Sequence, residues 1–335
     1  MFRRNQLLNF LSHYKELRPQ FAEEARLIQQ ANFGNGVFIR GLIEVSSFCR
    51  CDCFYCGIRK SNSTAQRYRL TDEEILSCCK YGYEKGFRTF VLQGGEDLHF
   101  SAEGLAKLIL KIKELFPDCA VTLSLGERDY ETYKLWRDAG ADRYLLRHEA
   151  ADPILYSKLH PAEQSLENRK QCLFALKELG FQVGSGFMVG APFQTIRDLA
   201  QDIMFLQELQ PHMIGIGPFI PHKASPFANE PAGNVELTLF FISLLRVIFP
   251  DALIPATTAL NTLSKTGRID GIRAGANVVM PNLSPEENRK KYDLYEGKSK
   301  GGIETADGLK DLILEMEKIN YKILLNERGD HRSCK

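Results

Sequence analysis

Short apolar runs alternate with stretches of mixed polarity along most of the chain. The runs are bounded by glycine, proline or polar residues, which is typical of strands buried on both faces. They predict strands at 37–45, 89–93, 120–124, 143–147, 182–189, 213–219, 252–256 and 277–280. The stretches between them repeat apolar residues at helical spacing and predict a helix after each strand.

The first of these helices begins after Thr71, and the others are expected at 101–115, 130–139, 166–179, 195–209, 237–249, 270–274 and 306–318. Two of them have clear start signals. Thr71 followed by Glu74 is a capping box, and Ser101 is a favourable N-cap. Upstream of the first strand, residues 5–31 predict two short helices broken near Pro19.

Eight strand-then-helix units favour an α/β fold with a parallel sheet, closed into a (β/α)8 TIM-type barrel. An open, doubly wound sheet is the alternative topology. The helices before the first strand form an N-terminal helical extension. We therefore expect the extension at 1–34, one barrel domain at 35–320 and a C-terminal tail at 321–335.

The chain has 335 residues, of which 44% are hydrophobic and 25% charged, so it can bury a sizeable core. Its 43 Lys and Arg against 42 Asp and Glu leave a net charge of +1. That balance gives no basis for electrostatic binding to nucleic acid or to an anionic membrane. No run approaches the ~20 apolar residues that span a bilayer, and the N-terminus resembles an amphipathic helix rather than a signal peptide. We expect a cytoplasmic protein that binds neither nucleic acid nor membrane.

Four of the nine cysteines fall within residues 49–56. Without a secretion signal, such a tight cluster indicates a metal site rather than a disulfide framework. Cys49, Cys53 and Cys56 form a C-x3-C-x2-C pattern. An iron–sulfur cube needs four ligands, so three cysteines leave one iron open to a small chelating molecule. A four-thiolate zinc or iron–sulfur site that includes Cys51 is the alternative, but we expect Cys51 to be a bystander.

Polar residues and glycines collect where successive strands end. The carboxyl ends of the strands in a parallel barrel meet at one rim, where barrel enzymes have their active sites. We therefore expect a lined cavity at this rim. The strand-end residues that would contribute to it are Gly94, Gly95, Glu96, Ser124, Arg147, Glu149, Thr257 and Thr258.

The cysteine loop after the first strand, with Tyr55 directly before its last cysteine, resembles the signature of the radical SAM superfamily. The resemblance implies one [4Fe–4S] cluster on Cys49, Cys53 and Cys56. It also implies that the amino and carboxylate groups of S-adenosylmethionine bind the open iron. Tyr55 and Ser124 are further cofactor-binding candidates.

Gly94-Gly95-Glu96 resembles the GGE motif of this superfamily, whose backbone and carboxylate receive the methionine amino group. Glu149 and Arg169 resemble the pair that holds the ribose hydroxyls and the methionine carboxylate. Their chemistry suits these roles, because a carboxylate accepts hydrogen bonds from hydroxyls and a guanidinium pairs with a carboxylate. A plain turn at the glycines and a structural ion pair between Glu149 and Arg169 are the alternatives.

Longer strings resemble the FeFe-hydrogenase maturase family HydE, which is related to methylornithine synthase and biotin synthase. They lie at 67–71, 91–97, 122–127, 143–149, 215–222, 254–259, 275–282 and 292–298. The resemblance implies anaerobic radical chemistry in H-cluster assembly. S-adenosylmethionine would be cleaved reductively to a 5′-deoxyadenosyl radical, which acts on an iron–cysteine complex that carries carbon monoxide and cyanide. HydG and HydF are the implied maturase partners, and reduced ferredoxin or flavodoxin the electron donor.

Many members of this family carry three further cysteines that bind a second cluster. Lys300, Gly308 and Asp311 stand where we would place those cysteines, and residues 299–333 contain none. We therefore expect this chain to lack a second cluster.

Residues near strand ends, or on the segment that resembles a lid, are candidates for the substrate cavity: Met213, Thr257, Thr258, Met280, Tyr295 and Arg147. Core packing is the alternative for the methionines, a hydroxyl bonded to its own backbone for the threonines, and a neighbouring carboxylate partner for the arginine. Two other functions stay open. One is a methylornithine synthase-like mutase, whose lysine substrate would need an acidic partner for its side-chain amine. The other is a non-catalytic iron–sulfur carrier.

Overall fold

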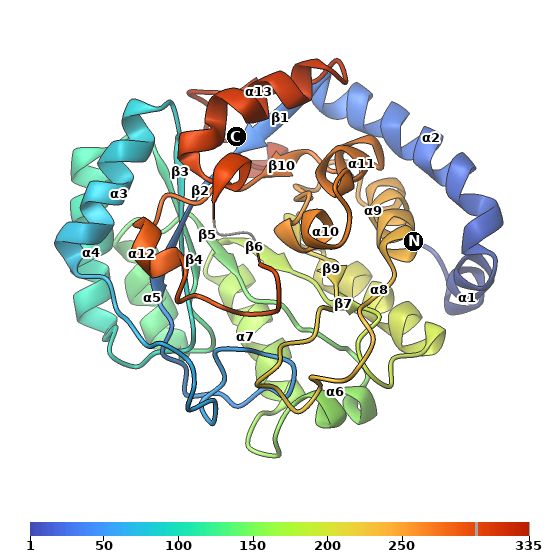
Figure 1. Cartoon of the computed structure of the whole chain (residues 1–335), viewed down its shortest axis with the longest axis horizontal. Helices are drawn as coiled ribbons and strands as arrows, with labels where there is room; N and C mark the ends of the chain where they lie inside the picture. The colour runs from blue at the N-terminus through green and yellow to red at the C-terminus, as the bar shows by residue number, and fades with distance from the viewer. Residues whose placement is uncertain (299–300, 335) are drawn as a thin grey trace.

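Parallel strands form a central barrel that is surrounded by helices (Figure 1). The computed structural model describes residues 1–298 and 301–334. The main sheet has the strand order β2-β3-β4-β5-β6-β8, and all its pairings are parallel. Its strands are β2 (Gly41–Ser46), β3 (Thr89–Gly94), β4 (Ala120–Ser124), β5 (Arg143–Leu145), β6 (Gln182–Ser185) and β8 (Met213–Ile214).

Single β-bridges close this sheet into a barrel by way of residues 252–256 and β10 (Val278–Val279). The bridges join Met213 to Leu253, Pro255 to Val278, and Leu42 to Asn282. Residues 252–256 form single β-bridges instead of the predicted continuous strand, because Pro255 has no N–H to donate to a neighbouring strand. The closure confirms the predicted (β/α)8 barrel and rules out the open sheet.

Three predicted strands are each divided in two. Residues 37–45 form β1 (Gly36–Ile39) and β2, residues 182–189 form β6 and β7 (Met188–Val189), and residues 213–219 form β8 and β9 (Gly217–Pro218). The break before β7 includes Gly186, where an added Cβ would lie 1.9 Å from the Gly215 carbonyl oxygen. Two backbone segments approach each other so closely there that no side chain fits between them.

The alternation of side chains along β2 separates the barrel interior from the packing against the helices. Ile43 and Val45 are buried in the large hydrophobic core. Leu42 and Glu44, on the opposite face, line the cavity described below. Because successive side chains of a strand point to opposite faces, one strand contributes both to the core and to the site.

The helices cover the outside of the barrel, with α1 and α2 running along its surface beside α8 and α9 (Figure 1). Among the described residues, no helix combines the length and apolar character that a bilayer span requires. The helix bounds are α1 (Arg4–Ser12), α2 (Tyr14–Phe33), α3 (Asp72–Glu84), α4 (Ala102–Leu115), α5 (Tyr130–Asp138), α6 (Pro153–Leu159), α7 (Leu166–Glu178), α8 (Ile196–Leu209), α9 (Val235–Ile248), α10 (Thr258–Leu263), α11 (Gly267–Arg273), α12 (Glu286–Arg289) and α13 (Leu309–Glu317), with 3-10 turns η1 (Gly302–Glu304), η2 (Ala306–Gly308) and η3 (Arg332–Cys334).

Both predicted N-caps are confirmed: Thr71 forms a capping box with Glu74, and the Ser101 hydroxyl accepts a hydrogen bond from the backbone of α4. The predicted break near Pro19 is wrong, since α1 ends at Ser12 and Pro19 lies inside α2. Proline costs a helix one backbone hydrogen bond. Packing outweighs that cost here: the ring of Phe21 contacts Phe240 of α9, with ring centroids 5.3 Å apart.

Residues 322–331 cross the N-terminal end of the barrel, opposite the strand ends that carry the predicted site. β11 (Lys322–Leu324) pairs in parallel with β1. Arg143 of β5 is fully buried and donates hydrogen bonds to Thr89, to the Arg328 carbonyl oxygen and to the Asp330 carboxylate (2.6 Å). The division of the chain at residues 34 and 320 remains a prediction.

The Asp330–Arg143 pair predicts a pH-dependent contribution to stability. Burial opposes ionisation of Asp330, but Arg143 and hydrogen bonds from Gln182 and Arg328 outweigh it and lower the pKa to about 2. The contribution is therefore complete above the unfolded-state value of about 4 and is lost as the pH falls through about 2. Asp330→Asn should lower the free energy of unfolding at neutral pH by roughly 2 kcal/mol, measured by urea denaturation.

The matched control is Glu317→Gln, which changes an exposed carboxylate and should alter stability by less than about 0.5 kcal/mol. Between pH 4 and pH 2 the difference between wild type and Asp330→Asn should shrink. Equal stability of the two proteins at neutral pH would contradict the assigned role of the pair.

Candidate active site

A cavity of about 420 Å³ opens at the carboxyl ends of the barrel strands. The cysteine loop forms one wall, and residues 292–298 belong to another. The predicted site residues that line it are Cys49, Cys53, Tyr55, Cys56, Gly94, Gly95, Glu96, Ser124, Arg147, Glu149, Arg169, Thr257, Thr258, Met280 and Tyr295. Residues that are up to 246 positions apart in the sequence (from Cys49 to Tyr295) therefore meet around one space.

Met213 is the exception among these candidates, because the structure places it below the cavity. It is buried with Phe38, Leu253 and Val278 in a cluster inside the barrel, and its sulfur accepts a hydrogen bond from Arg40 (3.0 Å). Met213 stands at the start of β8, so its side chain faces the interior but lies too far from the rim. Met188 on β7 lines the cavity instead.

The cysteine loop is held against the end of β3 by a backbone contact that only glycine permits. An added Cβ on Gly95 would lie 2.1 Å from the Phe48 carbonyl oxygen and 2.7 Å from the Cys49 Cβ. The next amide, of Glu96, donates a hydrogen bond to the Cys49 sulfur (3.3 Å). Such N–H to sulfur bonds are one way in which proteins tune cysteine-bound iron–sulfur clusters.

The thiols of the loop are free and lie in a setting that suits metal binding. Cys49, Cys53 and Cys56 all face the same cavity and none is in a disulfide. A hydrogen bond from Cys51 lowers the pKa of Cys49 to about 7 against the effect of burial. Burial raises the pKa of Cys53 to about 11 and also raises that of Cys56. A bound cation would stabilise these buried thiolates, so the donor set fits a cluster held by three cysteines.

Arg67 fixes the far side of the cysteine loop. Its guanidinium donates hydrogen bonds to the carbonyl oxygens of Ile58 (2.8 Å) and Arg59 (2.6 Å) and to that of Ser47. The Tyr55 hydroxyl lies 3.1 Å from His160 Nε2, which ties the loop to the end of α6. These protein contacts fix the shape of the loop on both sides.

The Glu96 carboxylate of the Gly-Gly-Glu segment lies in the cavity wall and is 6% exposed. Arg50 donates to its Oε1 (2.6 Å), and the Glu127 backbone N–H donates to its Oε2 (2.8 Å). An ionised carboxylate has about four acceptor positions. Glu96 can therefore still accept a hydrogen bond from an ammonium group in the cavity.

Glu149 and Arg169 both face the cavity but are not paired with each other. Arg147 lies 3.1 Å from the Glu149 carboxylate, and Arg169 forms its ion pair with Glu127. Burial alone would lower the pKa of Arg169, but the Glu127 carboxylate raises it well above its usual value. The alternative of a Glu149–Arg169 ion pair is thus wrong, whereas the carboxylate partner that we gave as the alternative for Arg147 is present.

Glu149 adopts a left-handed backbone conformation, with φ of 63°. Its amide donates to the Gly186 carbonyl oxygen (3.1 Å), which holds this conformation in place. A non-glycine residue in this region stores backbone strain, and such residues cluster at functional sites. In this conformation the side chain of Glu149, four residues beyond the end of β5, forms part of the cavity wall.

The sequence analysis missed four charged residues of the cavity: Glu44, Arg268, Lys298 and Glu304. Lys298 pairs with Glu44, and Arg268 pairs with Glu304. Thr258 also donates a hydrogen bond to Glu304 (3.2 Å), while Thr257 Oγ1 is buried without a partner among the described residues. Glu44 carried a detectable signal, because it and Arg40 are the two charged residues in the otherwise apolar predicted strand at 37–45.

Gly308 and Asp311, two of the three positions where we would place the second-cluster cysteines, are not among the residues that line this cavity. Lys300 falls outside the described residues. At Gly308 an added Cβ would lie 2.4 Å from the Gly302 carbonyl oxygen, so the backbone there leaves no room for a cysteine side chain. Asp311 is exposed on α13.

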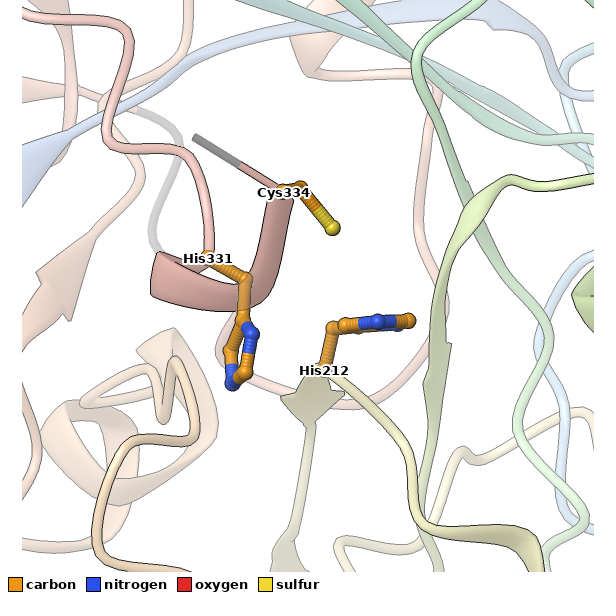
Figure 2. A group of neighbouring side chains, drawn as sticks. All are labelled: His212, His331 and Cys334. Atoms are coloured by element: carbon orange, nitrogen blue, oxygen red, sulfur yellow. The ribbon is translucent and has the colours of Figure 1, made fainter.

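His212, His331 and Cys334 form another group of possible metal ligands, at the opposite end of the barrel (Figure 2). The Val183 N–H donates to His212 Nδ1 (3.0 Å), and the Ser333 N–H donates to His331 Nδ1 (3.3 Å). A neutral imidazole has one acceptor nitrogen. In His212 and in His331 that nitrogen already accepts a backbone hydrogen bond. Metal binding by His212 would leave the buried Val183 amide unpaired. We assign this group to anchoring residues 331–334 and not to metal binding.

Comparison with known proteins identifies the family. The model of the Radical SAM superfamily matches residues 43–206. The [FeFe] hydrogenase maturase subunit HydE of Thermotoga maritima is 49% identical over 271 residues, which is 81% of this chain and 77% of that protein. The chain belongs to the HydE family of radical SAM enzymes. The resemblance seen in the motifs is therefore confirmed.

Relatives outside the HydE family are also similar over most of the chain. The 3-methylornithine synthase of Methanosarcina acetivorans is 30% identical over 80% of this chain and 77% of that protein. The crystal structure of methylornithine synthase (PylB) has a TM-score of 0.85 at 28% identity and covers 97% of this chain and 94% of that one. The maturase HydG from Carboxydothermus hydrogenoformans shares the fold, with a TM-score of 0.79 at 17% identity over 97% and 81%. Membership of the superfamily implies a [4Fe–4S] cluster and S-adenosylmethionine.

The contact at Gly95 predicts that this position controls cluster binding. Gly95→Ala should push the cysteine loop away from β3 and weaken cluster retention roughly tenfold, measured as iron and sulfide per chain after anaerobic reconstitution. Gly215→Ala is the matched control, because Gly215 lines the same cavity and its added Cβ would meet no atom closer than 4.0 Å. Full iron content in Gly95→Ala would refute this account of the loop.

Proposed function

We propose that this member of the HydE family acts in [FeFe]-hydrogenase maturation, cleaving S-adenosylmethionine reductively and acting on an iron–cysteine complex with carbon monoxide and cyanide ligands. The observation that carries the proposal is one cavity in which three free thiols and the Gly-Gly-Glu segment face Thr257, Thr258 and Met280. Thiols and substrate candidates share one enclosed space. The 49% identity to a HydE maturase supports the same function.

Cys49, Cys53 and Cys56 would hold the single [4Fe–4S] cluster. When bound together, the reduced cluster and S-adenosylmethionine supply methionine and a 5′-deoxyadenosyl radical. Glu96 accepts the methionine amino group, Arg169 pairs with the methionine carboxylate, and Glu149 accepts hydrogen bonds from the ribose hydroxyls. Tyr55 and Ser124 contribute the remaining cofactor wall.

The residues on the opposite side of the cavity would bind and shield the substrate. Thr257 offers a hydroxyl with no protein partner among the described residues. Arg147, which is paired with Glu149, still offers its Nε donor, which has no hydrogen-bond partner among those residues, to an anionic ligand. Tyr295 and Met280 close off apolar surface, and burial raises the Tyr295 pKa, which keeps its hydroxyl protonated. Exclusion of water by such residues protects reactive intermediates.

A lysine mutase of the methylornithine synthase type is the second candidate, supported by the 28–30% identities. A lysine ammonium group would need a free carboxylate in the cavity. Glu96 is assigned to the methionine amino group, and the other carboxylates that line the described cavity each have a cationic partner: Glu44 with Lys298, Glu149 with Arg147, and Glu304 with Arg268. This compensation favours a maturase substrate over lysine.

A non-catalytic cluster carrier explains less of the site. A carrier needs the thiols but has no use for a buried guanidinium and carboxylate arranged around the same cavity. We further propose HydG and HydF as maturation partners, reduced ferredoxin or flavodoxin as the electron donor, and the cytoplasm as the site of action. The absence of a second cluster is part of the same proposal and rests on the missing cysteines.

The ligand assignment predicts different effects for neighbouring cysteines. Cys49→Ala should lower 5′-deoxyadenosine formation by about 100-fold or more, because the cluster loses one of its ligands. Cys51→Ala, two residues away on the same cavity wall, should keep most of the activity. The assay is anaerobic reconstitution with iron and sulfide, followed by dithionite and S-adenosylmethionine. Equal activity of Cys49→Ala and wild type would refute the assignment.

The substrate assignment predicts which added compound is consumed. Reconstituted enzyme should consume the iron–cysteine product of HydG, measured as a shift of its carbon monoxide and cyanide infrared bands, and should leave free lysine unchanged. Thr257→Val should lower turnover of that complex roughly tenfold, while cleavage of S-adenosylmethionine without substrate stays near wild type. Conversion of lysine would establish the mutase instead.

A further inference from the structure

Glu127 lies between the two groups that would receive the methionine end of S-adenosylmethionine. It follows β4 and contacts both through different atoms. Its backbone N–H donates to the Glu96 carboxylate (2.8 Å). Its own carboxylate accepts hydrogen bonds from Nε of Arg169 and from Asn168 (2.5 Å).

We propose that Glu127 is a positioning residue that fixes the carboxylate-binding guanidinium of Arg169 relative to the ammonium-binding Glu96. The inference rests on the proposed binding of S-adenosylmethionine at this site and deepens it. The amino and carboxylate groups of methionine are attached to one carbon atom. Their two receptors must therefore keep a fixed spacing, and a single residue in contact with both provides it.

One nitrogen of the Arg169 guanidinium, Nη2, keeps both of its N–H groups for a ligand. Nε donates to Glu127, and Nη1 donates to the Arg147 carbonyl oxygen (2.9 Å). Among residues 1–298 and 301–334, none accepts a hydrogen bond from Nη2. Arg169 is 9% exposed and lines the cavity. Two of its hydrogen bonds thus fix the guanidinium plane, and Nη2 is the donor available to a carboxylate in the cavity.

The turn that carries Glu127 is itself held rigidly. Gly126 has φ of +79°, and an added Cβ there would lie 2.2 Å from Glu96 Oε2. The Gly126 carbonyl oxygen accepts hydrogen bonds from the hydroxyls of Tyr144 (2.8 Å) and Tyr133 (3.3 Å). Both tyrosines are fully buried. The turn cannot easily move away from Glu96, so the spacing between Glu96 and Arg169 depends on the Glu127 side chain.

The test compares two ligands that differ only in the carboxylate. S-adenosylmethionine and decarboxylated S-adenosylmethionine are bound to cluster-loaded protein, and their dissociation constants are measured by anaerobic equilibrium dialysis. Glu127→Gln should weaken S-adenosylmethionine binding about tenfold, the effect expected for a misplaced charge-assisted hydrogen bond. Binding of the decarboxylated ligand should change by less than about twofold.

Glu167→Gln is the matched control, since it makes the same change on an exposed residue of α7, the helix that carries Arg169. It should leave both dissociation constants unchanged. Asn168→Ala removes the second hydrogen bond to Glu127, together with a long contact to Cys172 Sγ (3.9 Å), and should produce a smaller shift in the same direction. If Glu127→Gln does not fold, the effect of Asn168→Ala on the two dissociation constants tests the positioning role instead. In an Arg169→Gln background, Glu127→Gln should have no further effect.

Equal weakening of both ligands by Glu127→Gln would overturn the inference, because it would indicate general damage to the cavity. Unchanged binding of S-adenosylmethionine would overturn it as well. If the wild type itself binds no S-adenosylmethionine, the proposed function fails. If the wild type binds it but Glu127→Gln does so equally well, only the positioning role fails.

Discussion

The site depends on one constraint: every strand pairing in the barrel is parallel, so all strands end at the same rim. The cysteine loop follows β2, the Gly-Gly-Glu segment follows β3, and the Glu127 turn follows β4. Closure through residues 252–256 and β10 brings Thr257 and Met280 around to face them. An open sheet with the same strands would place these segments along a line, where they could not enclose a ligand.

Charge compensation is the second organising feature of the cavity. Each lining carboxylate has a cationic partner, often from a different strand end. Buried charges are costly unless they are paired and hydrogen-bonded. These pairs therefore stabilise the walls while leaving the site without a strong net charge. Selectivity must come from the remaining donors and acceptors, such as Nη2 of Arg169 and the Thr257 hydroxyl.

Local signals predicted local features well. Residues 120–124 were predicted as a strand with the observed bounds, because a short apolar run there has clear polar ends. The caps at Thr71 and Ser101 depend on neighbouring residues alone. The break predicted at Pro19 was wrong because α2 is stabilised by contacts with α9, which lies far away in the sequence. The prediction that Met213 lines the cavity was wrong. The alternation of side chains along a strand indicates which face a side chain points to, but not how far it lies from the rim.

The partners of the charged site residues could not have been read from the sequence. Arg169 pairs with Glu127 and not with Glu149, and Lys298 pairs with Glu44 more than 250 positions earlier. Such pairs depend on the distances between strand ends in the closed barrel. The motifs predicted which residues reach the cavity, while the fold determines which of them meet.

The crossing of the barrel base by residues 322–331 has a consequence for synthesis. Thr89, Arg143 and Gln182 are made long before Arg328 and Asp330, yet their buried polar atoms bond to those later residues. A nascent chain that lacks residues 322–331 has a buried arginine without its carboxylate, which is strongly unfavourable. The base of the barrel is therefore completed only after residues 322–331 have been made, which is later than every strand that carries the site.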